Sequence, residues 1–269
     1  MNNSPESIQN DVIHSWHIRA HAYVQLIERW PIFTHMVARL LAFIPKEFDG
    51  HALDIAGGSG LVSEHLLRRS PKSRVTLIEP AQGMRELASH RLGKQVEIKD
   101  TTSDNIDKLE LTADAALCSA SFHLINEETT LPSIASALKK DSIFAVNLWG
   151  HSFDETINLQ KNTDWTQFVD QALHEFYLPP MKPPNKISSR IKSKERLEII
   201  GNNCGLQLNE MNIVTTNIDT RFSIEFAAMD YKFLNQVEKG IREKVIARAL
   251  ELCRGIDTIS TVDFKFEKI

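Results

Sequence analysis

The chain has 269 residues, of which 42% are hydrophobic and 25% are charged, and its formal net charge at pH 7 is −4. This length allows one large or two small domains with a substantial core, and the composition is that of a globular protein. The negative charge argues against a nucleic-acid substrate, because binding one needs a basic face that neutralises phosphates. Cys118, Cys204 and Cys253 are too few and too scattered for a disulfide framework or a zinc site.

Neither a membrane span nor a secretion signal is predicted. No apolar run approaches the roughly 18 residues that a span requires, and the polar start Met1–Glu6 lacks the pattern of a signal peptide. We therefore expect a cytoplasmic protein that does not bind a membrane.

Residues 1–50 are predicted to be helical and to form an N-terminal lid. Apolar residues recur at helical spacing over residues 6–30, and Pro31 can begin a second helix that runs through Leu41. His14, His17 and His21 fall near one face of the first helix at a spacing that suits a metal. No ligand set is completed nearby, so a solvated or capping face is favoured and no metal site is predicted.

The central stretch of the chain is Leu53–Gly60, an apolar run that ends in Asp54 and then breaks at three glycines. Glycine adopts positive φ readily and lets a ligand approach the backbone closely. The following helix, from Leu61, would direct its N-terminal amides at that ligand. The dinucleotide pattern G-x-G-x-x-G fails, because Ser63 stands where the last glycine is needed.

The pattern that does fit is acidic-x-small-x-Gly-x-Gly, formed by Asp54, Ala56, Gly58 and Gly60. It resembles the first motif of the class I S-adenosylmethionine (SAM) methyltransferases, in which glycine usually stands at the position of Ala56. The resemblance implies that SAM is the cofactor. A plain structural turn is the alternative interpretation of such a loop.

Acidic residues follow the next two predicted strands. After the helix Leu61–Arg69, the strand Arg74–Ile78 ends at Glu79, which is placed to accept hydrogen bonds from both ribose hydroxyls. The alternative for Glu79 is a place near the N-terminus of the helix Ala81–Leu92. The strand Val96–Lys99 ends at Asp100 and Thr101, for which the resemblance implies contact with adenine and for which a turn is the alternative.

The same family pattern continues through the fifth strand. The strand Ala113–Ser119 is followed by a segment with the pair Phe122 and His123, which resembles the fourth-strand motif of the methyltransferases. A helix from Asn126 to Leu138, a turn at residues 139–142 and a strong strand Ile143–Trp149 complete this part. The resemblance therefore covers about residues 51–150, which we expect to be the SAM-binding core.

Alternating strands and helices predict an α/β fold with a doubly wound, mostly parallel sheet of seven strands, similar to the Rossmann fold, with helical cap segments. Residues 151–186 are predicted to be an inserted cap that ends in a proline-rich break. Residues 187–269 are predicted to be the C-terminal part of the fold. They comprise the helix Lys194–Asn203, the strand Leu206–Ile218, one or two helices over Phe222–Arg254, and a last strand Thr258–Lys268 that the resemblance places antiparallel.

The function predicted from these patterns is SAM-dependent methyl transfer to a small, partly apolar molecule of the kind found in specialised metabolism, with O-methylation favoured over N-, S- or C-methylation. The alternative is a protein that binds SAM without transferring the methyl group, because binding motifs and chemistry are separable. A nicotinamide dehydrogenase is a more distant alternative.

Ligands of such sheets bind at the carboxyl ends of the strands, and the candidate site residues follow from that. The cofactor candidates are Asp54, Ala56, Gly57, Gly58, Gly60, Glu79, Pro80, Met84, Asp100, Thr101, Ser119 and Tyr23. The acceptor candidates are Trp16, Phe122 and Trp149, with core packing as the alternative for the aromatic residues. The candidate general bases are His123 and His151, because neutral imidazole accepts a proton near pH 7; a structural or capping role is the alternative.

A basic segment suggests a possible partner. Six basic residues, Lys182, Lys186, Arg190, Lys192, Lys194 and Arg196, surround the single acid Glu195. Such a segment could dock an acidic carrier protein or a phosphate-bearing acceptor, and a solvated loop is the alternative. We expect a monomer or a homodimer.

Overall fold

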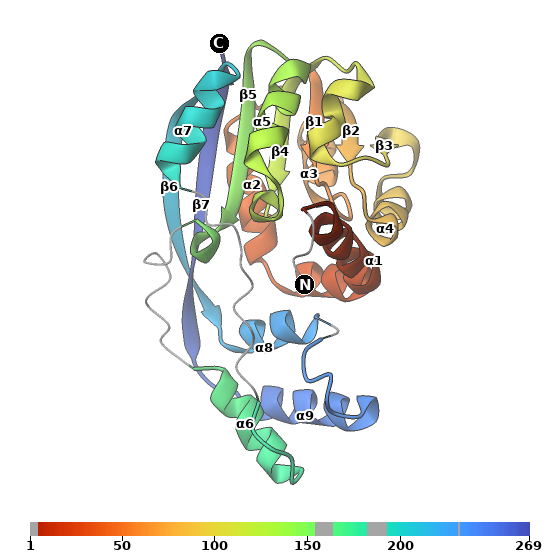
Figure 1. Ribbon diagram of the computed structural model, residues 1–269, viewed down its shortest axis with the longest axis vertical. Coiled ribbons are helices and arrows are strands. Elements are labelled where there is room, and N and C mark those ends of the chain that lie inside the picture. Colours follow the sequence, from red (N-terminus) through yellow and green to blue (C-terminus); the bar gives the residue numbers. More distant parts are fainter. Residues whose placement is uncertain (1–4, 154–163, 182–192, 231) are drawn as a thin grey trace.

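A computed structural model describes residues 5–153, 164–181, 193–230 and 232–269. Its main body is a twisted sheet with helices on both faces, and a smaller group of helices lies beyond one end of the sheet (Figure 1). Part of the predicted cap at residues 151–186, together with the predicted basic residues Lys182, Lys186, Arg190 and Lys192, lies outside the described residues.

The sheet has seven strands in the order β3-β2-β1-β4-β5-β7-β6. Their bounds are β1 His51–Ile55, β2 Arg74–Ile78, β3 Glu97–Lys99, β4 Ala113–Ser119, β5 Leu138–Trp149, β6 Leu206–Asp219 and β7 Ile256–Lys268. Strands β1 to β5 pair in parallel, whereas β7 runs antiparallel between β5 and β6. The predicted fold class and the antiparallel last strand are confirmed.

The described helices agree with the predicted ones to within a few residues. Their bounds are α1 Pro5–Arg29, α2 Ile32–Ala42, α3 Leu61–Arg69, α4 Gln82–Leu92, α5 Glu127–Ala137, α6 Thr166–Glu175, α7 Lys194–Asn203, α8 Arg221–Ala228 and α9 Lys239–Leu252. Short 3₁₀ turns are η1 Gly93–Gln95, η2 Ser103–Leu109, η3 Phe122–Leu124 and η4 Gly150–Ser152. Among the described residues, no helix is both long enough and apolar enough to cross a membrane.

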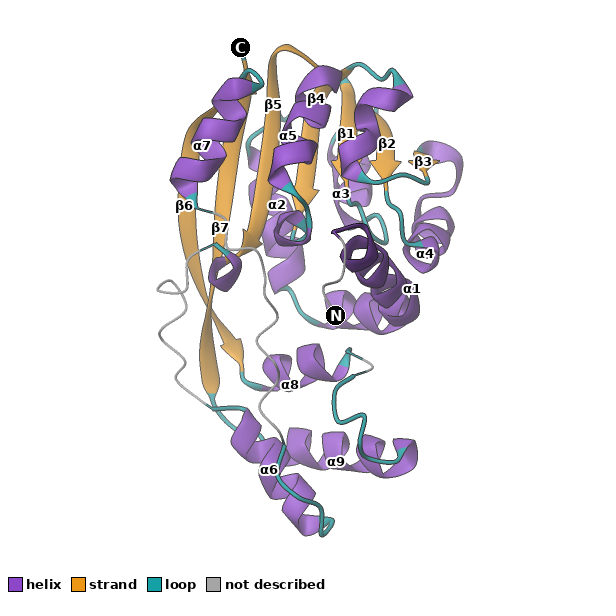
Figure 2. Cartoon of the chain, in the orientation of Figure 1, coloured by secondary structure: helices purple, strands orange, loops and turns teal. Residues whose placement is uncertain are grey.

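Each face of the sheet has its own apolar core, because successive side chains of a strand point to opposite faces. In β1, Leu53 and Ile55 belong to the core that α5 and α7 cover, whereas Ala52 belongs to the core that α2, α3 and α4 cover. Helices α5 and α7 lie in front of the sheet in Figure 2, and α2 and α3 lie behind it. Asp54 shares the face of Ala52, so its carboxylate points toward α3.

The turn predicted at residues 139–142 is wrong, because these residues belong to β5. Leu138 pairs with Ala113 and Ile143 pairs with Ala115, so the ladder to β4 is irregular between these pairs. Asp141 adopts a φ of 64° within this segment. The sequence Lys-Lys-Asp-Ser has turn chemistry, but the strand continues through it, with an irregular register to β4 at this point.

The helices beyond the sheet form a separate lobe. Helices α6, α8 and α9 enclose a core that includes Val169, Leu173, Ile224, Val245 and Ala249. Strands β6 and β7 extend past the other strands toward this lobe (Figure 1). Helix α8 of this lobe and helix α1 both lie near the carboxyl ends of the central strands (Figure 1), where we expect the ligands.

Candidate functional site

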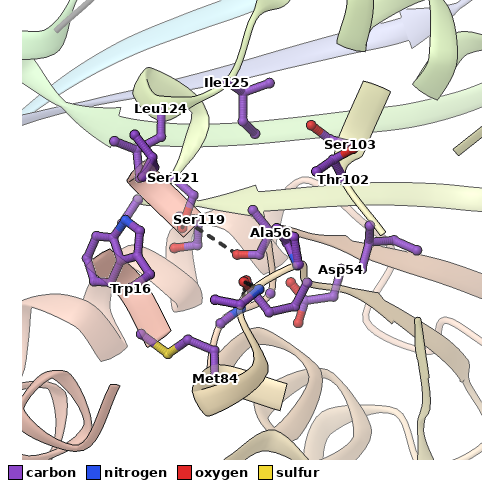
Figure 3. Close-up of a pocket in the computed structure, with 18 of the residues that line it drawn as sticks. Trp16, Asp54, Ala56, Met84, Thr102, Ser103, Ser119, Ser121, Leu124 and Ile125 are labelled. Atoms are coloured by element: carbon purple, nitrogen blue, oxygen red, sulfur yellow. Dashed lines mark hydrogen bonds between the residues drawn. The ribbon is translucent and has the colours of Figure 1, made fainter. Parts of the chain in front are cut away.

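A pocket of about 400 Å³ lies at the carboxyl ends of β1, β2, β4 and β5. This volume is within the range of small-molecule sites. Its walls come from the glycine loop, the residues after β2, β3 and β4, and the inner face of α1. Figure 3 shows Trp16 on one side of the pocket and Asp54, Thr102 and Ser103 on the other.

The loop after β1 turns through three residues in the left-handed region. The φ angles are 50° at Ala56, 54° at Gly58 and 83° at Gly60. Ala56 adopts this conformation with a Cβ atom, at a cost that glycine avoids. A Cβ on Gly57 would lie 2.8 Å from Cγ of Asp54, whereas a Cβ on Gly58 would meet only Sδ of Met84, at 3.9 Å. The backbone at Gly58 is therefore open to a ligand.

Asp54 links β1 to the start of α3. Its Oδ2 atom accepts hydrogen bonds from the Ser63 amide at 3.1 Å and from the Ser63 hydroxyl at 2.6 Å. Its Oδ1 atom is buried and has no hydrogen-bond partner among the described residues. Burial raises the pKa of Asp54 to about 6, against the opposing effect of the Ser63 hydrogen bonds. One carboxylate oxygen is thus left to receive a donor or a cation.

Glu79 connects the glycine loop to the start of α4. Its Oε2 atom accepts a hydrogen bond from the Gly58 amide at 3.0 Å, and its Oε1 atom accepts one from the Ala81 amide at 2.8 Å. The side chain is buried, and burial raises its pKa to about 7 although both hydrogen bonds favour the charged form. Glu79 also lines the pocket, so each oxygen can accept a further bond from a ligand.

The end of β4 is held by a residue that the sequence analysis missed. Asn147 of β5 is fully buried. Its Oδ1 atom accepts hydrogen bonds from the Ser119 hydroxyl at 2.9 Å and the Ala120 amide at 3.1 Å, and its Nδ2 atom donates to the carbonyl of Met36 at 2.8 Å. Ala120 adopts a φ of 55°. Asn147 stabilises this turn, which lines the pocket; the apolar strand around it gave no signal of such a role.

The second half of the pocket is aromatic. Five rings line it, from Trp16, Tyr23, Phe33, Trp149 and Phe226. They pack edge to face in a chain, with centroid distances between 5.3 and 5.9 Å. Burial raises the pKa of Tyr23 far above its ordinary value, and the nearby Glu79 carboxylate adds to this effect. Phe33 and Phe226 were not predicted as site residues, because their helical spacing indicates only a buried face.

Most of the predicted site residues line this pocket. These are Trp16, Tyr23, Asp54, Ala56, Gly57, Gly58, Glu79, Pro80, Met84, Ser119, His123 and Trp149. Five others are not among the lining residues: Gly60, Asp100, Thr101, Phe122 and His151.

The reason differs for each of these five. A Cβ on Gly60 would lie 2.6 Å from Cδ1 of Leu92, so this glycine serves the packing of the loop on α4. Phe122 is fully buried and its ring packs on Phe144 at 6.0 Å. His151 is exposed in η4, at the end of β5. Thr101 stands in the same connection as Asp100, before the residues that face the pocket.

The acidic residue that lines the pocket after β3 is Asp104. The Asp100 side chain is 68% exposed and pairs with Arg85 at 2.7 Å. Thr102, Ser103 and Asp104 line the pocket instead, and Oδ1 of Asp104 is buried without a hydrogen-bond partner among the described residues. Sequence spacing placed the acid directly at the strand end, whereas the connection reaches the pocket at Thr102 and its acidic residue there is Asp104.

The histidines of α1 do not form a metal site in the described part of the chain, where no group of three His, Cys, Asp or Glu side chains could hold an ion. Nδ1 of His17 accepts a hydrogen bond from the Gly83 amide at 3.0 Å, in the first turn of α4. For His17, the capping role that the sequence analysis favoured over a metal site is therefore confirmed.

The chemistry of the pocket favours a ligand that carries positive charge and hydrogen-bond donors. Among the described residues, three carboxylates and no lysine or arginine line it. Three buried oxygen atoms of pocket residues have no hydrogen-bond partner among the described residues. They are Oδ1 of Asp54, Oγ of Ser59 and Oδ1 of Asp104. SAM has an ammonium group, a sulfonium centre and ribose hydroxyls, so it fits these groups. A dinucleotide pyrophosphate would instead place its negative charges next to these carboxylates.

Comparisons with known proteins match one part of the chain to a known domain. Residues 52–141 match the family described as "Methyltransferase domain". The malonyl-[acyl-carrier protein] O-methyltransferase of Acetivibrio thermocellus is 31% identical over 102 residues, which are 37% of this chain and 35% of that protein. The chain thus spans about a third of the length of this curated relative.

Solved structures show the same fold. The YcgJ protein of Bacillus subtilis has a TM-score of 0.56 at 13% identity, with 87% of this chain and 98% of that chain covered. A chain from the Haloferax volcanii complex that contains the Trm112 methyltransferase activator has a TM-score of 0.56 at 17% identity, with 93% and 97% covered. The domain match over residues 52–141 is thus to a methyltransferase domain, and together with the glycine loop it supports SAM as the cofactor.

Proposed function

We propose that this protein transfers a methyl group from SAM to a small, partly apolar acceptor. The observation that carries the proposal is that one pocket joins a half lined by carboxylates to a half lined by aromatic rings. The first half suits the cofactor, and the second can bind an apolar molecule and exclude water.

The chain's own residues have separate tasks in this proposal. Glu79 would accept hydrogen bonds from the ribose hydroxyls, and the free oxygens of Asp54 and Asp104 would accept from the polar groups at the two ends of the cofactor. Met84 and Pro80 would pack against it. When bound, SAM supplies a methyl group on a positively charged sulfur. The protein mainly has to align the acceptor atom with that carbon.

The acceptor atom that we favour is a hydroxyl oxygen, with His123 as the general base. His123 lines the pocket beside Ser121 and Leu124, so its imidazole is placed to take a proton from an acceptor there. His151, the other candidate, is exposed and does not line the pocket. The proposal therefore assigns the base role to His123.

Labelled SAM tests methyl transfer directly. The protein would be incubated with methyl-labelled SAM and a panel of phenols, aliphatic alcohols and amines, and the release of S-adenosylhomocysteine (SAH) would be measured. Transfer to a hydroxyl compound supports the proposal. SAM binding without SAH release from any acceptor class would favour the alternative, a protein that binds SAM without transferring methyl. Tighter binding of NAD than of SAM in calorimetry would overturn both.

An acceptor held on an acidic carrier protein is a variant of this proposal, suggested by the name of the Acetivibrio relative. The described part of the basic segment gives it little support. Arg196 pairs with Glu127 at 2.8 Å and with Glu128 at 2.6 Å, and Lys194 lies 3.5 Å from Glu198. We therefore favour a free small molecule, and the same assay with a malonyl-loaded carrier protein separates the two.

A further inference from the structure

Helix α8 belongs to two cores at once. Phe222 and Met229 pack with Trp149 in the aromatic core next to the pocket, and Phe226 lines the pocket itself. Ile224 points the other way and lies in the core of the helical lobe formed by α6, α8 and α9. The position of this lobe and the position of one pocket wall are therefore set by the same short helix.

Glu225 fastens α8 to the junction between α1 and α2. Its Oε2 atom accepts a hydrogen bond from Nε1 of Trp30 at 2.8 Å, and its Oε1 atom accepts one from Nη1 of Arg29 at 2.6 Å. The Glu225 side chain is 17% exposed and the Arg29 side chain is 67% exposed. The bond to Trp30 is thus the more shielded one, and the exposed ion pair contributes little.

Both helices that meet at this junction supply pocket residues. Helix α1 carries Trp16 and Tyr23, and α2 carries Phe33. The Trp30 ring packs on Phe222 at 5.4 Å, and the Phe33 ring packs on Trp149 at 5.7 Å. The Glu225 carboxylate therefore links α8 to the junction of the two other helices that form the aromatic half of the pocket.

From this geometry we infer that Glu225 is a positioning residue for the acceptor, because it sets the spacing of Phe33, Trp149 and Phe226. The inference rests on the proposed function, since it assumes that the aromatic half holds the acceptor. Glu225 does not line the pocket, and the carboxylates of the cofactor half are held by other partners, the Ser63 and Gly58 amides. Loss of Glu225 should therefore weaken acceptor binding and leave cofactor binding intact.

The test uses the full chain saturated with SAH and the uncharged aromatic probe N-phenyl-1-naphthylamine, whose fluorescence rises in apolar surroundings. Glu225→Ala removes the acceptor for Trp30, whereas Glu225→Gln keeps an acceptor oxygen and removes the charge. Glu251→Ala is the matched control, because Glu251 is also a helical glutamate of the lobe and pairs with Arg248 at 3.0 Å. SAH affinity and the thermal midpoint are measured for each variant.

We expect Glu225→Ala to weaken the probe by about tenfold, as for loss of a hydrogen bond to a charged group. Glu225→Gln should restore most of that affinity, and Glu251→Ala should match the wild type. SAH affinity should stay within about twofold in all of them.

Wild-type affinity for the probe in Glu225→Ala would overturn the inference and leave the proposed function standing. Parallel loss of probe and SAH binding would also overturn it, because the change would then be general loosening. If the wild type binds SAH but not the probe, the pocket lacks the apolar wall that the inference needs, and the inference is overturned. Failure of the wild type to bind SAH or SAM would instead remove the proposed function.

Discussion

The Glu79 carboxylate accepts a hydrogen bond from the Gly58 amide at 3.0 Å, so the acid that ends β2 holds the loop that follows β1. The two neighbouring strands thus contribute one unit to the cofactor half of the pocket. The carboxylate is both a proposed ligand of the ribose and a support for the backbone that surrounds the ligand.

The first prediction concerns this double role. Glu79→Ala should weaken SAM binding by at least tenfold, because it removes charge-assisted hydrogen bonds to the ribose and frees the Gly58 amide. Glu79→Asp should be milder. Isothermal calorimetry with SAM measures the effect, and Glu97→Ala serves as control, since Glu97 is an acid on β3 paired with Lys99 at 2.6 Å. Wild-type affinity in Glu79→Ala would show that the ribose lies elsewhere.

The second prediction is a pH dependence of SAM binding. Burial raises the pKa of Glu79 to about 7 and that of Asp54 to about 6 in the free protein. A bound cation favours the ionised carboxylates and lowers these pKa values, so binding near pH 6–7 should release protons. SAM affinity should therefore rise from pH 5.5 to pH 8.

The same pKa values make the stability of the free protein depend on pH. A carboxyl whose pKa is raised by folding binds more protons when folded, so it contributes less stability as pH rises from its unfolded pKa to its folded pKa. The increase in thermal midpoint produced by SAM should accordingly be larger at pH 8 than at pH 6. Calorimetry at pH 6.5 in two buffers with different ionisation heats counts the released protons. Equal apparent heats in both buffers would contradict the prediction, and Glu79→Gln should remove most of the difference.

The third prediction compares two glycines that share a positive φ. Gly58 has a φ of 54° and Gly93 a φ of 57°, and a Cβ on Gly93 would meet no atom within 4 Å. Gly58→Val and Gly93→Val should each cost roughly 1–2 kcal/mol of stability, because an L side chain is strained at positive φ. Only Gly58→Val should abolish SAH binding in calorimetry. Equal SAH affinities of the two variants would place the cofactor away from the loop.

The sequence was informative where a local pattern determines the structure. Strand β2 and helix α3 have the predicted bounds, because glycines, prolines and acidic residues mark the ends of short apolar runs. The cofactor half was likewise predictable, since Asp54, Gly58 and Glu79 lie within or next to such ends. The positions of these residues follow from the local strand–turn–helix pattern.

The remaining site residues depend on contacts between distant segments. Asn147 acts on the turn after β4 from a neighbouring strand, and Phe226 reaches the pocket from a helix that follows β6. Neither has a local signal. Asp104 lines the pocket in place of Asp100, because Asp100 pairs with Arg85 and the connection after β3 reaches the pocket only after that residue. Sequence spacing alone does not specify this path.

The last prediction concerns the chemistry. Sequence order placed His123 after β4 and His151 after β5, which made both candidates for a base beside one crevice. In the structure only His123 lines the pocket, while His151 is exposed in η4.

With a hydroxyl acceptor, His123→Ala should lower turnover by roughly 10²–10⁴ while SAM affinity stays unchanged. His151→Ala, the matched control, should retain wild-type turnover. Steady-state kinetics with the same hydroxyl substrate measures the turnover of both variants. Normal turnover of His123→Ala on a hydroxyl substrate would exclude it as the base, and a loss confined to His151→Ala would mean that this loop moves into the pocket during the reaction.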